Sequence, residues 1–199
     1  MYPVITISRQ FGSGGRSIGR AVAEELEIPF FDGEIINKIA ESSGYAKETV
    51  ENSVENLSSI NKWFDVSAAS AMYYQSPQDE IFLATRKFIL EQAEAGPCVI
   101  VGRCADYILR DAGVDCLNVL IHADMEHRIN RVTMKYGEIK DADVAKRIKK
   151  KDKQRKSYYR YYTDEIWGDY HNYDLCLDSG KIGEDMCIKT ICDIAKSME

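Results

Sequence analysis

SRQFGSGGRS, residues 8–17, joins the first apolar run of the chain, residues 4–7, to its first amphipathic stretch. The three glycines of this segment let the backbone take positive φ angles and point several N–H groups inward, and the helix expected to follow adds the positive end of its dipole. A turn of this kind between a strand and a helix is typical of phosphate sites in α/β proteins. The alternative is a tight connection that needs glycine only for packing.

The turn is a degenerate form of the phosphate-loop pattern G-x-x-x-x-G-K-[ST]. Gln10 stands at the first glycine and Arg16 at the lysine, whereas Gly15 and Ser17 match the pattern. We therefore expect the turn to bind phosphate, with Arg16 as the catalytic cation on it. The predicted nucleotide-binding residues are Gly12, Ser13, Gly14, Gly15, Arg16 and Ser17.

The composition is that of an ordinary globular domain. The chain has 199 residues, of which 45% are hydrophobic and 29% charged, enough for one α/β domain with a substantial core. Its formal net charge of −6 argues against non-specific nucleic-acid binding, which needs a basic surface. No basic leader or membrane-length apolar run is present, so we expect a cytoplasmic protein without membrane contacts. The six cysteines are scattered without C-x-x-C pairing, which predicts neither disulfides nor zinc.

Apolar runs and amphipathic stretches alternate along the chain outward from the glycine-rich turn. Short apolar runs predict strands at residues 4–7, 29–32, 98–101, 117–121 and 173–178. Helical spacing predicts helices over residues 18–26, 34–43, 81–95, 125–160 and 182–198. Strands that alternate with helices in this way predict a single α/β domain, built on a doubly wound, parallel, five-stranded sheet with helices on both faces.

Two stretches stand apart from this alternation. Residues 45–80 are more polar and carry aromatic side chains, which we interpret as a helical insert on the substrate side. Residues 135–165 concentrate Lys and Arg in an otherwise acidic chain, which favours a lid that binds an anion. Arg147 and Arg155 share one helical face there and are predicted to stabilise charge on a transferring phosphoryl group. A solvated basic helix is the alternative.

Charged residues also follow two of the predicted strands. Open α/β sheets bind ligands beyond the carboxyl ends of their strands, so Asp32, Arg103 and Asp106 are candidates for substrate binding. Asp32 could instead cap the helix expected to begin near residue 34, and Arg103 could form a surface ion pair. Arg86, on the helix before the third strand, is a weaker candidate for the same substrate phosphate.

The order of these parts along the chain is specific. The glycine-rich turn is followed by Phe-Asp-Gly at 31–33, Gly-Arg at 102–103, VLIHADMEHR at 119–128, the basic segment and YDLCLDSG at 173–180. In this order the chain resembles the cytidylate-kinase-like family of P-loop nucleoside monophosphate kinases over nearly its whole length. The resemblance implies a P-loop NTPase-type fold, an ATP site at the glycine-rich turn, a monophosphate site reached by Asp32 and Arg103, and a mobile lid.

The chain departs from the pattern of that family at residues that matter for catalysis. Arg16 replaces the lysine, and its planar guanidinium is bulkier than an ammonium between two phosphates. Cys104 follows Arg103 where the family has aspartate, and Val101 replaces an acid. These changes leave Ser17, with Asp32 or Asp106, to position the Mg²⁺ ion that the resemblance implies.

Two functions from different classes fit these features. The first is a phosphotransferase that uses ATP and Mg²⁺ and transfers the γ-phosphoryl group to a nucleoside monophosphate, such as CMP, or to another small phosphorylated acceptor. The second is a nucleotide-binding sensor or partner-binding protein that has kept the phosphate cradle and lost transfer. The degenerate turn favours the sensor, and the basic lid favours the enzyme. The sequence leaves the acceptor and the oligomeric state open.

Overall fold

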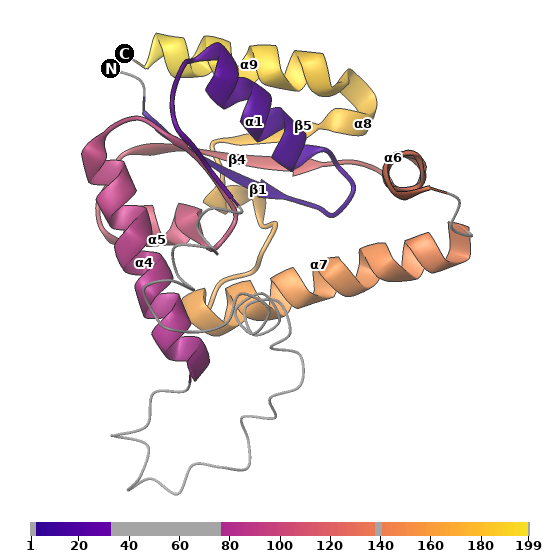
Figure 1. The fold of residues 1–199 in the computed structure, drawn as a ribbon, viewed down its shortest axis with the longest axis horizontal. Coiled ribbons are helices and arrows are strands. Elements are labelled where there is room, and N and C mark those ends of the chain that lie inside the picture. Colours follow the sequence, from indigo (N-terminus) through magenta and orange to yellow (C-terminus); the bar gives the residue numbers. More distant parts are fainter. Residues whose placement is uncertain (1–2, 33–76, 138–140, 199) are drawn as a thin grey trace, which may run out of the picture.

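The five predicted strands form one parallel sheet in the computed structural model, which describes residues 3–32, 77–137 and 141–198 (Figure 1). The strands are β1 (Val4–Arg9), β2 (Phe30–Phe31), β3 (Val99–Val101), β4 (Cys116–His122) and β5 (Leu175–Asp178). Their order in the sheet is β2-β3-β1-β4-β5, with every neighbouring pair parallel. The prediction of a five-stranded parallel sheet is confirmed, and the glycine-rich turn leaves the central strand.

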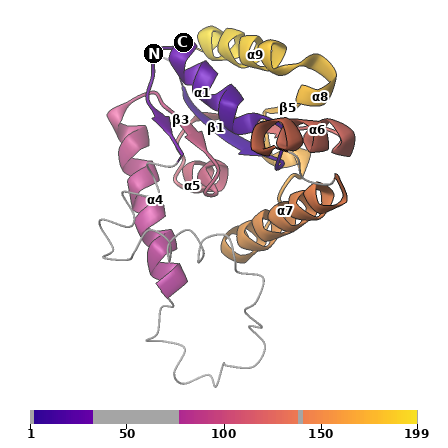
Figure 2. The same ribbon diagram turned by 45° about the vertical axis from the view of Figure 1, so that its right-hand side comes forward.

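Helices cover both faces of the sheet, as predicted (Figures 1 and 2). One face packs on α1 (Gly15–Glu25) and α9 (Glu184–Ser197), and the other on α4 (Pro77–Ala95) and α5 (Ala105–Asp111). Successive strand side chains point to opposite faces, so the sheet residues divide between two cores. The core under α1 and α9 includes Ile5, Ile7, Val99 and Val101, and the core under α4 and α5 includes Val4, Cys98 and Ile100.

Two further helices follow β4. They are α6 (Met125–Tyr136) and α7 (Asp141–Thr163), and α7 lies on the opposite side of the molecule from α9 (Figure 1). Asp124 caps α6, because its side chain accepts a hydrogen bond from the backbone N–H of His127 at 2.7 Å. The stretch predicted as helical over 125–160 forms two helices, which pack against each other.

Several predicted boundaries were wrong. The chain ends in two helices, α8 (Ser179–Ile182) and α9, because Gly183 between them has a φ of 82° that breaks the helix. A short 3₁₀ helix, Tyr170–Asn172, occupies the approach to β5, which begins at residue 175. The helix before β3 begins at residue 77, inside the predicted insert. The rest of that insert and the helix predicted over 34–43 lie outside the described residues.

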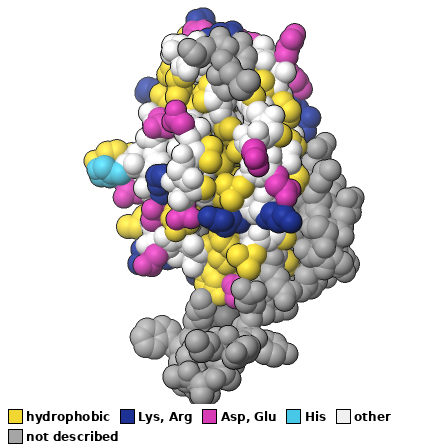
Figure 3. Space-filling view, turned by 90° about the vertical axis from the view of Figure 1, so that its left-hand side faces the viewer, with side chains coloured by type: hydrophobic (Ala, Val, Ile, Leu, Met, Phe, Trp, Pro, Cys, Tyr) yellow, Lys and Arg dark blue, Asp and Glu magenta, His cyan; other side chains and the backbone are white. Residues whose placement is uncertain are grey.

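The surface on the α4 side mixes charges of both signs with hydrophobic side chains (Figure 3). No helix in the described part of the chain is both long and apolar enough to cross a membrane.

Candidate active site

The glycine-rich turn folds into a loop that ends at the first residue of α1. Gly12 and Gly14 have φ angles of 87° and 85°, and Gly14 is the N-cap of the helix. Ser13 is fully buried, and its hydroxyl donates to the carbonyl oxygens of Gln10 and Ile121, both at 3.0 Å. The side chain of Ser13 therefore fixes the loop to β4. Only the backbone of Ser13 is left to contact a ligand. The predicted phosphate loop thus has its N–H groups at a helix N-terminus that no side chain caps.

Arg16 does not lie over this loop, because its side chain turns to Asp32 beyond β2. The Nε of Arg16 lies 2.6 Å from one carboxylate oxygen of Asp32, and an Nη of Arg9 lies 3.8 Å from the other. The side chain of Arg16 is 56% exposed, whereas that of Arg9 is 20% exposed. The structure thus brings two predicted site residues together as an ion pair.

Ser17 contacts a pair that sequence reasoning missed, Arg131 of α6 and Glu184 of α9. The hydroxyl of Ser17 accepts from an Nη of Arg131 at 3.1 Å, and Arg131 donates to both carboxylate oxygens of Glu184, at 2.7 and 3.1 Å. A Cβ on Gly14 would lie 3.0 Å from the carboxyl carbon of Glu184, so this ion pair lies against the loop.

The residues near Ser17 do not fit a magnesium ion held by the protein. A guanidinium bonds the Ser17 hydroxyl and the neighbouring carboxylate, so the donor set is already neutralised by a cation. Among the described residues, no three His, Cys, Asp or Glu side chains group closely enough to hold a metal ion. Mg²⁺ is often bound mainly by substrate phosphates and water, and such an ion would need little from this chain.

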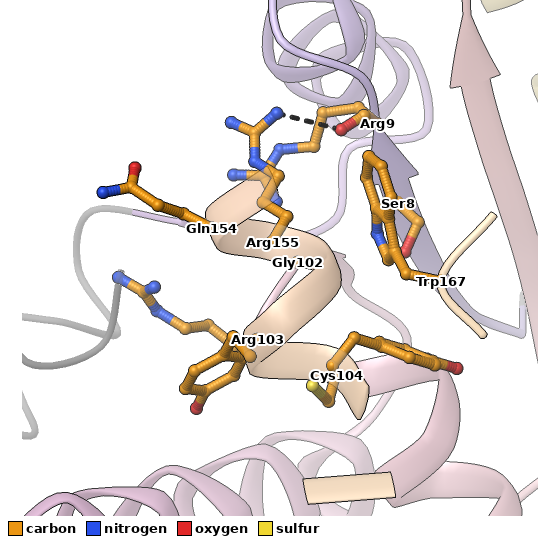
Figure 4. A pocket seen from close by; sticks show the side chains of 10 residues that line it. Ser8, Arg9, Gly102, Arg103, Cys104, Gln154, Arg155 and Trp167 are labelled. Atoms are coloured by element: carbon orange, nitrogen blue, oxygen red, sulfur yellow. Dashed lines mark hydrogen bonds between the residues drawn. The ribbon is translucent and has the colours of Figure 1, made fainter. Parts of the chain in front are cut away.

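A pocket opens beside the loop, at the carboxyl ends of β1 and β3 (Figure 4). Its walls are residues 8–9 from β1, residues 102–104 after β3, four side chains of α7 between 154 and 159, and Trp167. Among them are three guanidinium groups, and these come from three different elements: Arg9, Arg103 and Arg155. Of the predicted site residues, Arg103 and Arg155 therefore line one pocket, next to the predicted phosphate loop.

The turn after β3 is strained where it meets this pocket. Gly102, Arg103 and Cys104 have φ angles of 79°, 61° and 56°, and the last two are non-glycine residues in the left-handed region. Such a conformation persists only where surrounding contacts hold it, and it often marks a functional site. Burial raises the pKa of the Cys104 thiol well above its usual value, as is typical of a buried structural cysteine.

Helix α7 contacts the loop through one carboxylate and two arginines. Asp152 accepts from the backbone N–H of Phe11 at 2.8 Å and pairs with Arg128 of α6 at 2.5 Å. Arg155 donates to the carbonyl oxygen of Arg9 at 3.0 Å. The guanidinium carbons of Arg147 and Arg155 both lie 5.6 Å from the ring centre of Phe11. The predicted helical face thus reaches the loop, although Arg147 does not line the pocket.

Asp106 and Arg86 do not line this pocket. Asp106 is 2% exposed and accepts a hydrogen bond from the hydroxyl of Tyr159 at 2.9 Å. Burial raises the pKa of Asp106 to about 6, partly offset by that hydrogen bond. Arg86 pairs with Asp111 at 3.0 Å, between α4 and the end of α5. Asp106 therefore links α5 to α7 behind the pocket wall, through Tyr159, and neither residue lines the pocket itself.

Sequence reasoning missed several residues of the site. Arg9, Asp152 and Trp167 each contact the loop or line the pocket, yet only Arg9 stood within the stretch that the motif singled out. For Arg9, the signal in the sequence was a basic residue at the end of the first apolar run. Asp152 stood within a run of basic residues, where a single acid at helical spacing from Arg155 was the corresponding sign.

Comparisons with known proteins find similar sequences over most of the chain. A family model described as the cytidylate kinase-like family matches residues 4–181. A cytidylate kinase of Pyrobaculum calidifontis is 26% identical over 191 residues, covering 96% of this chain and 91% of that protein. One of Methanocorpusculum labreanum is 27% identical over 176 residues, covering 88% and 86%.

Solved structures give the same architecture. An uncharacterized protein from Eubacterium ventriosum superposes with a TM-score of 0.74 at 27% identity, covering 98% of this chain and 99% of that one. A shikimate kinase from Bacteroides thetaiotaomicron superposes with a TM-score of 0.56 at 13% identity, covering 98% and 99%. The second likeness concerns the fold alone, which is that of the P-loop kinases.

Proposed function

The chain belongs to the cytidylate kinase-like family, and we propose that it is an ATP-dependent phosphotransferase whose acceptor is a nucleoside monophosphate, such as CMP, or another small phosphorylated molecule. The observation that carries this proposal is the pocket lined by Arg9, Arg103 and Arg155, which adjoins a glycine-rich loop at a helix N-terminus. Three guanidinium groups around one cavity suit two phosphate groups that must approach each other despite their charge.

The donor side of the site is the loop from Gly12 to Ser17. Its backbone N–H groups and the dipole of α1 would orient the phosphates of ATP, and Mg²⁺ would neutralise part of their charge when bound with the nucleotide. The backbone of Ser13 is held in place from β4 and α8, because its carbonyl oxygen accepts from the hydroxyl of Ser179 at 2.6 Å. A rigid cradle of this kind stabilises developing charge without reorganising during the reaction.

The acceptor side is the pocket itself. Arg103, held in its unusual backbone conformation, would bind the acceptor phosphate through two N–H groups. Arg155 would contact the transferring group from α7, and the wall formed by Trp167 and the tyrosines would exclude water. No covalent intermediate is needed, because positioning and electrostatic stabilisation account for phosphoryl transfer in such sites.

A nucleotide-binding sensor is the second candidate, and two ion pairs favour it. Arg16 is paired with Asp32, and Arg131 with Glu184 contacts Ser17 at the mouth of the loop. A protein in which these pairs persist with ATP bound would hold a nucleotide without transferring its phosphate.

Thermal unfolding with ATP and Mg²⁺, followed by an assay for ADP with CMP or other monophosphates added, separates these functions. A ligand present at 100 times its Kd stabilises the folded state by about 2.7 kcal/mol, which raises the unfolding temperature measurably. We expect a shift with ATP and ADP formation that requires one particular monophosphate. A shift without turnover would identify the sensor, and no shift with ATP would contradict both.

Arg103→Gln tests the acceptor side, with Arg20→Gln as the matched control. Arg20 lies on α1, where its guanidinium stacks over Phe30 at 4.8 Å, outside the pocket. We expect Arg103→Gln to raise KM for the acceptor by about tenfold or more while KM for ATP changes little, since a charge-assisted hydrogen bond contributes roughly 1.5–3 kcal/mol. Equal KM values in the two variants would remove Arg103 from the proposed acceptor site.

A further inference from the structure

Arg9 takes up the space that a side chain at residue 15 would need. A Cβ placed on Gly15 would overlap the Cβ of Arg9 and lie 3.0 Å from its Cγ. A side chain that starts at residue 15 would therefore enter the same volume that the Arg9 side chain already fills. The two positions cannot both carry a side chain in this fold, so residue 15 must be glycine as long as residue 9 carries a side chain.

A second glycine borders the far end of the same side chain. A Cβ on Gly102 would overlap one Nη of Arg9 and lie 3.0 Å from its Cζ. The Arg9 side chain thus passes over the Cα of Gly15 on the first strand-to-helix turn and ends over the Cα of Gly102 on the second. This path leads the guanidinium to the pocket that Arg103 and Arg155 also line (Figure 4).

These contacts favour a different register of the phosphate-loop pattern from the one that the sequence suggested. With Gly14, the N-cap of α1, at the last glycine of G-x-x-x-x-G-K-[ST], Arg9 falls at the first glycine and Gly15 at the lysine. In this register the arginine stands where the pattern has its first glycine, and a glycine stands where the pattern has its lysine. The space that the lysine side chain would occupy is then filled from residue 9.

We propose that Arg9, rather than Arg16, is the cation of the loop that contacts the substrate phosphates, and that Gly15 and Gly102 leave room for its side chain. This inference rests on the proposed function, because it assumes that phosphates occupy the pocket. Asp32 lies closer to Arg16, at 2.6 Å, than to Arg9, at 3.8 Å, so its charge is offset mainly by Arg16, the more exposed of the two arginines. The planar guanidinium of Arg9 can hold two phosphate oxygens through a fixed fork of N–H groups, whereas a lysine ammonium acts as a compact point charge.

Inorganic tripolyphosphate is the probe that tests this assignment apart from turnover. Its affinity would be measured by calorimetry for wild type, Arg9→Gln, Arg16→Gln and the control Arg20→Gln, with thermal unfolding as a check on folding. We expect Arg9→Gln to weaken binding by roughly tenfold or more, the loss of a charge-assisted contact, and to do so by more than Arg16→Gln. Arg20→Gln should bind as wild type does.

The exchange of positions makes a sharper test. Gly15→Lys alone should lower the unfolding temperature, because the new side chain meets Arg9. In the double variant Arg9→Gly with Gly15→Lys, no arginine side chain blocks the space next to residue 15, and the new lysine can occupy it. The double variant should therefore bind tripolyphosphate better than Arg9→Gly alone. Arg9→Lys, which keeps the charge and the path, should fall between wild type and Arg9→Gln.

The outcomes separate the two proposals. A wild-type protein that binds neither tripolyphosphate nor ATP would overturn the proposed function, and this inference with it. A wild type that binds, with a folded Arg9→Gln that binds equally well, would overturn the assignment of Arg9 alone. A folded double variant no better than Arg9→Gly would show that the two side chains do not serve the same place.

Discussion

The two ends of α7 are attached to the protein in different ways. Toward its C-terminus, Tyr158 and Tyr159 are 8% and 2% exposed and belong to the large core under α4 and α5. Toward its N-terminus, Val144 and Ile148 join Val132 of α6 in a much smaller buried cluster. Since apolar burial supplies most of the stability, one end is an anchor and the other is held weakly. The weakly held end is the one that reaches Phe11 on the glycine-rich loop.

Asp152 joins that weaker end to the loop, beside the contacts that Arg147 and Arg155 make with Phe11. Asp152 bonds the backbone of Phe11 and the guanidinium of Arg128, and it lies 3.6 Å from an Nη of Arg155. Breaking these contacts would free the first turns of α7 without opening the core around Tyr159. A lid needs this combination of a firm anchor and a releasable end. The basic lid over 135–165 remains a prediction, and the contrast between the two ends is the way to test it.

The largest effect should come from the anchored end. Tyr159→Ala removes a buried ring and the hydrogen bond to Asp106, so we expect the free energy of unfolding to fall by about 4 kcal/mol. Urea denaturation measures this loss. The control is Tyr170→Ala, whose side chain is 67% exposed and should change stability by less than about 0.5 kcal/mol. Similar losses in both variants would show that this end is no anchor.

A smaller and more local effect is expected at the weak end. Asp152→Asn leaves the buried guanidinium of Arg128 without its charge partner, and should lower stability by about 2 kcal/mol. Amide hydrogen exchange should become faster in residues 141–153 and on the glycine-rich loop, but not in residues 158–163. Asp143→Asn, which breaks an exposed pair with Lys146 on the same helix, should leave the exchange pattern unchanged. Uniform acceleration along α7 would mean that the helix moves as one piece.

The smallest effect concerns the pH dependence of the anchored end. The pKa of Asp106 is raised from 3.8 to about 6, so between these values the folded state binds more protons than the unfolded state. The free energy of unfolding therefore falls as the pH rises from about 4 to 6. Above pH 6 the folded protein carries the full cost of a buried, charged carboxylate. The groups around this carboxyl are the Tyr159 hydroxyl, Arg110 and the Cys104 thiol, with Glu165 beyond Tyr159.

Asp106→Asn should remove that cost. We expect the free energy of unfolding to rise by about 1 kcal/mol at pH 7.5, because a neutral amide does not pay the cost of burying a charge. The gain stays small because the amide accepts a weaker hydrogen bond from Tyr159 than a carboxylate does. The gain should vanish near pH 4, where the wild-type carboxyl is protonated in the folded state. Thermal unfolding at both pH values measures it. A gain that is the same at both would mean that ionisation of Asp106 is not the cause.

Local patterns in the sequence predicted much of the fold. The apolar runs at 4–7, 98–101 and 117–121 are central strands whose side chains are buried on both faces, so they form continuous hydrophobic stretches. The short edge strand β2 and the start of β5 were predicted too long, because an edge strand buries less and leaves a weaker pattern. The break at Gly183 depended on a backbone angle that a helical periodicity does not reveal.

In the candidate site, too, some residues could be predicted from local patterns and others could not. Arg103 was placed correctly at the end of a strand, since strand ends follow from the sequence and in α/β sheets they border ligand sites. Asp106, three residues later, turned inward to Tyr159, a residue 53 positions away in the chain. Which of two nearby polar side chains faces a pocket depends on partners that no local pattern contains.

The sequence by itself determined that a glycine-rich turn follows the central strand of a parallel sheet, because hydrophobic periodicity and glycine punctuation are local properties of the chain. Only the tertiary structure decided where the charges of that turn point. Arg16 meets Asp32 across the end of β2, and Arg9 lies between two glycines that are 87 residues apart, 15 and 102. A guanidinium takes its position from the volumes and charges around it, and those come from segments that only folding brings together.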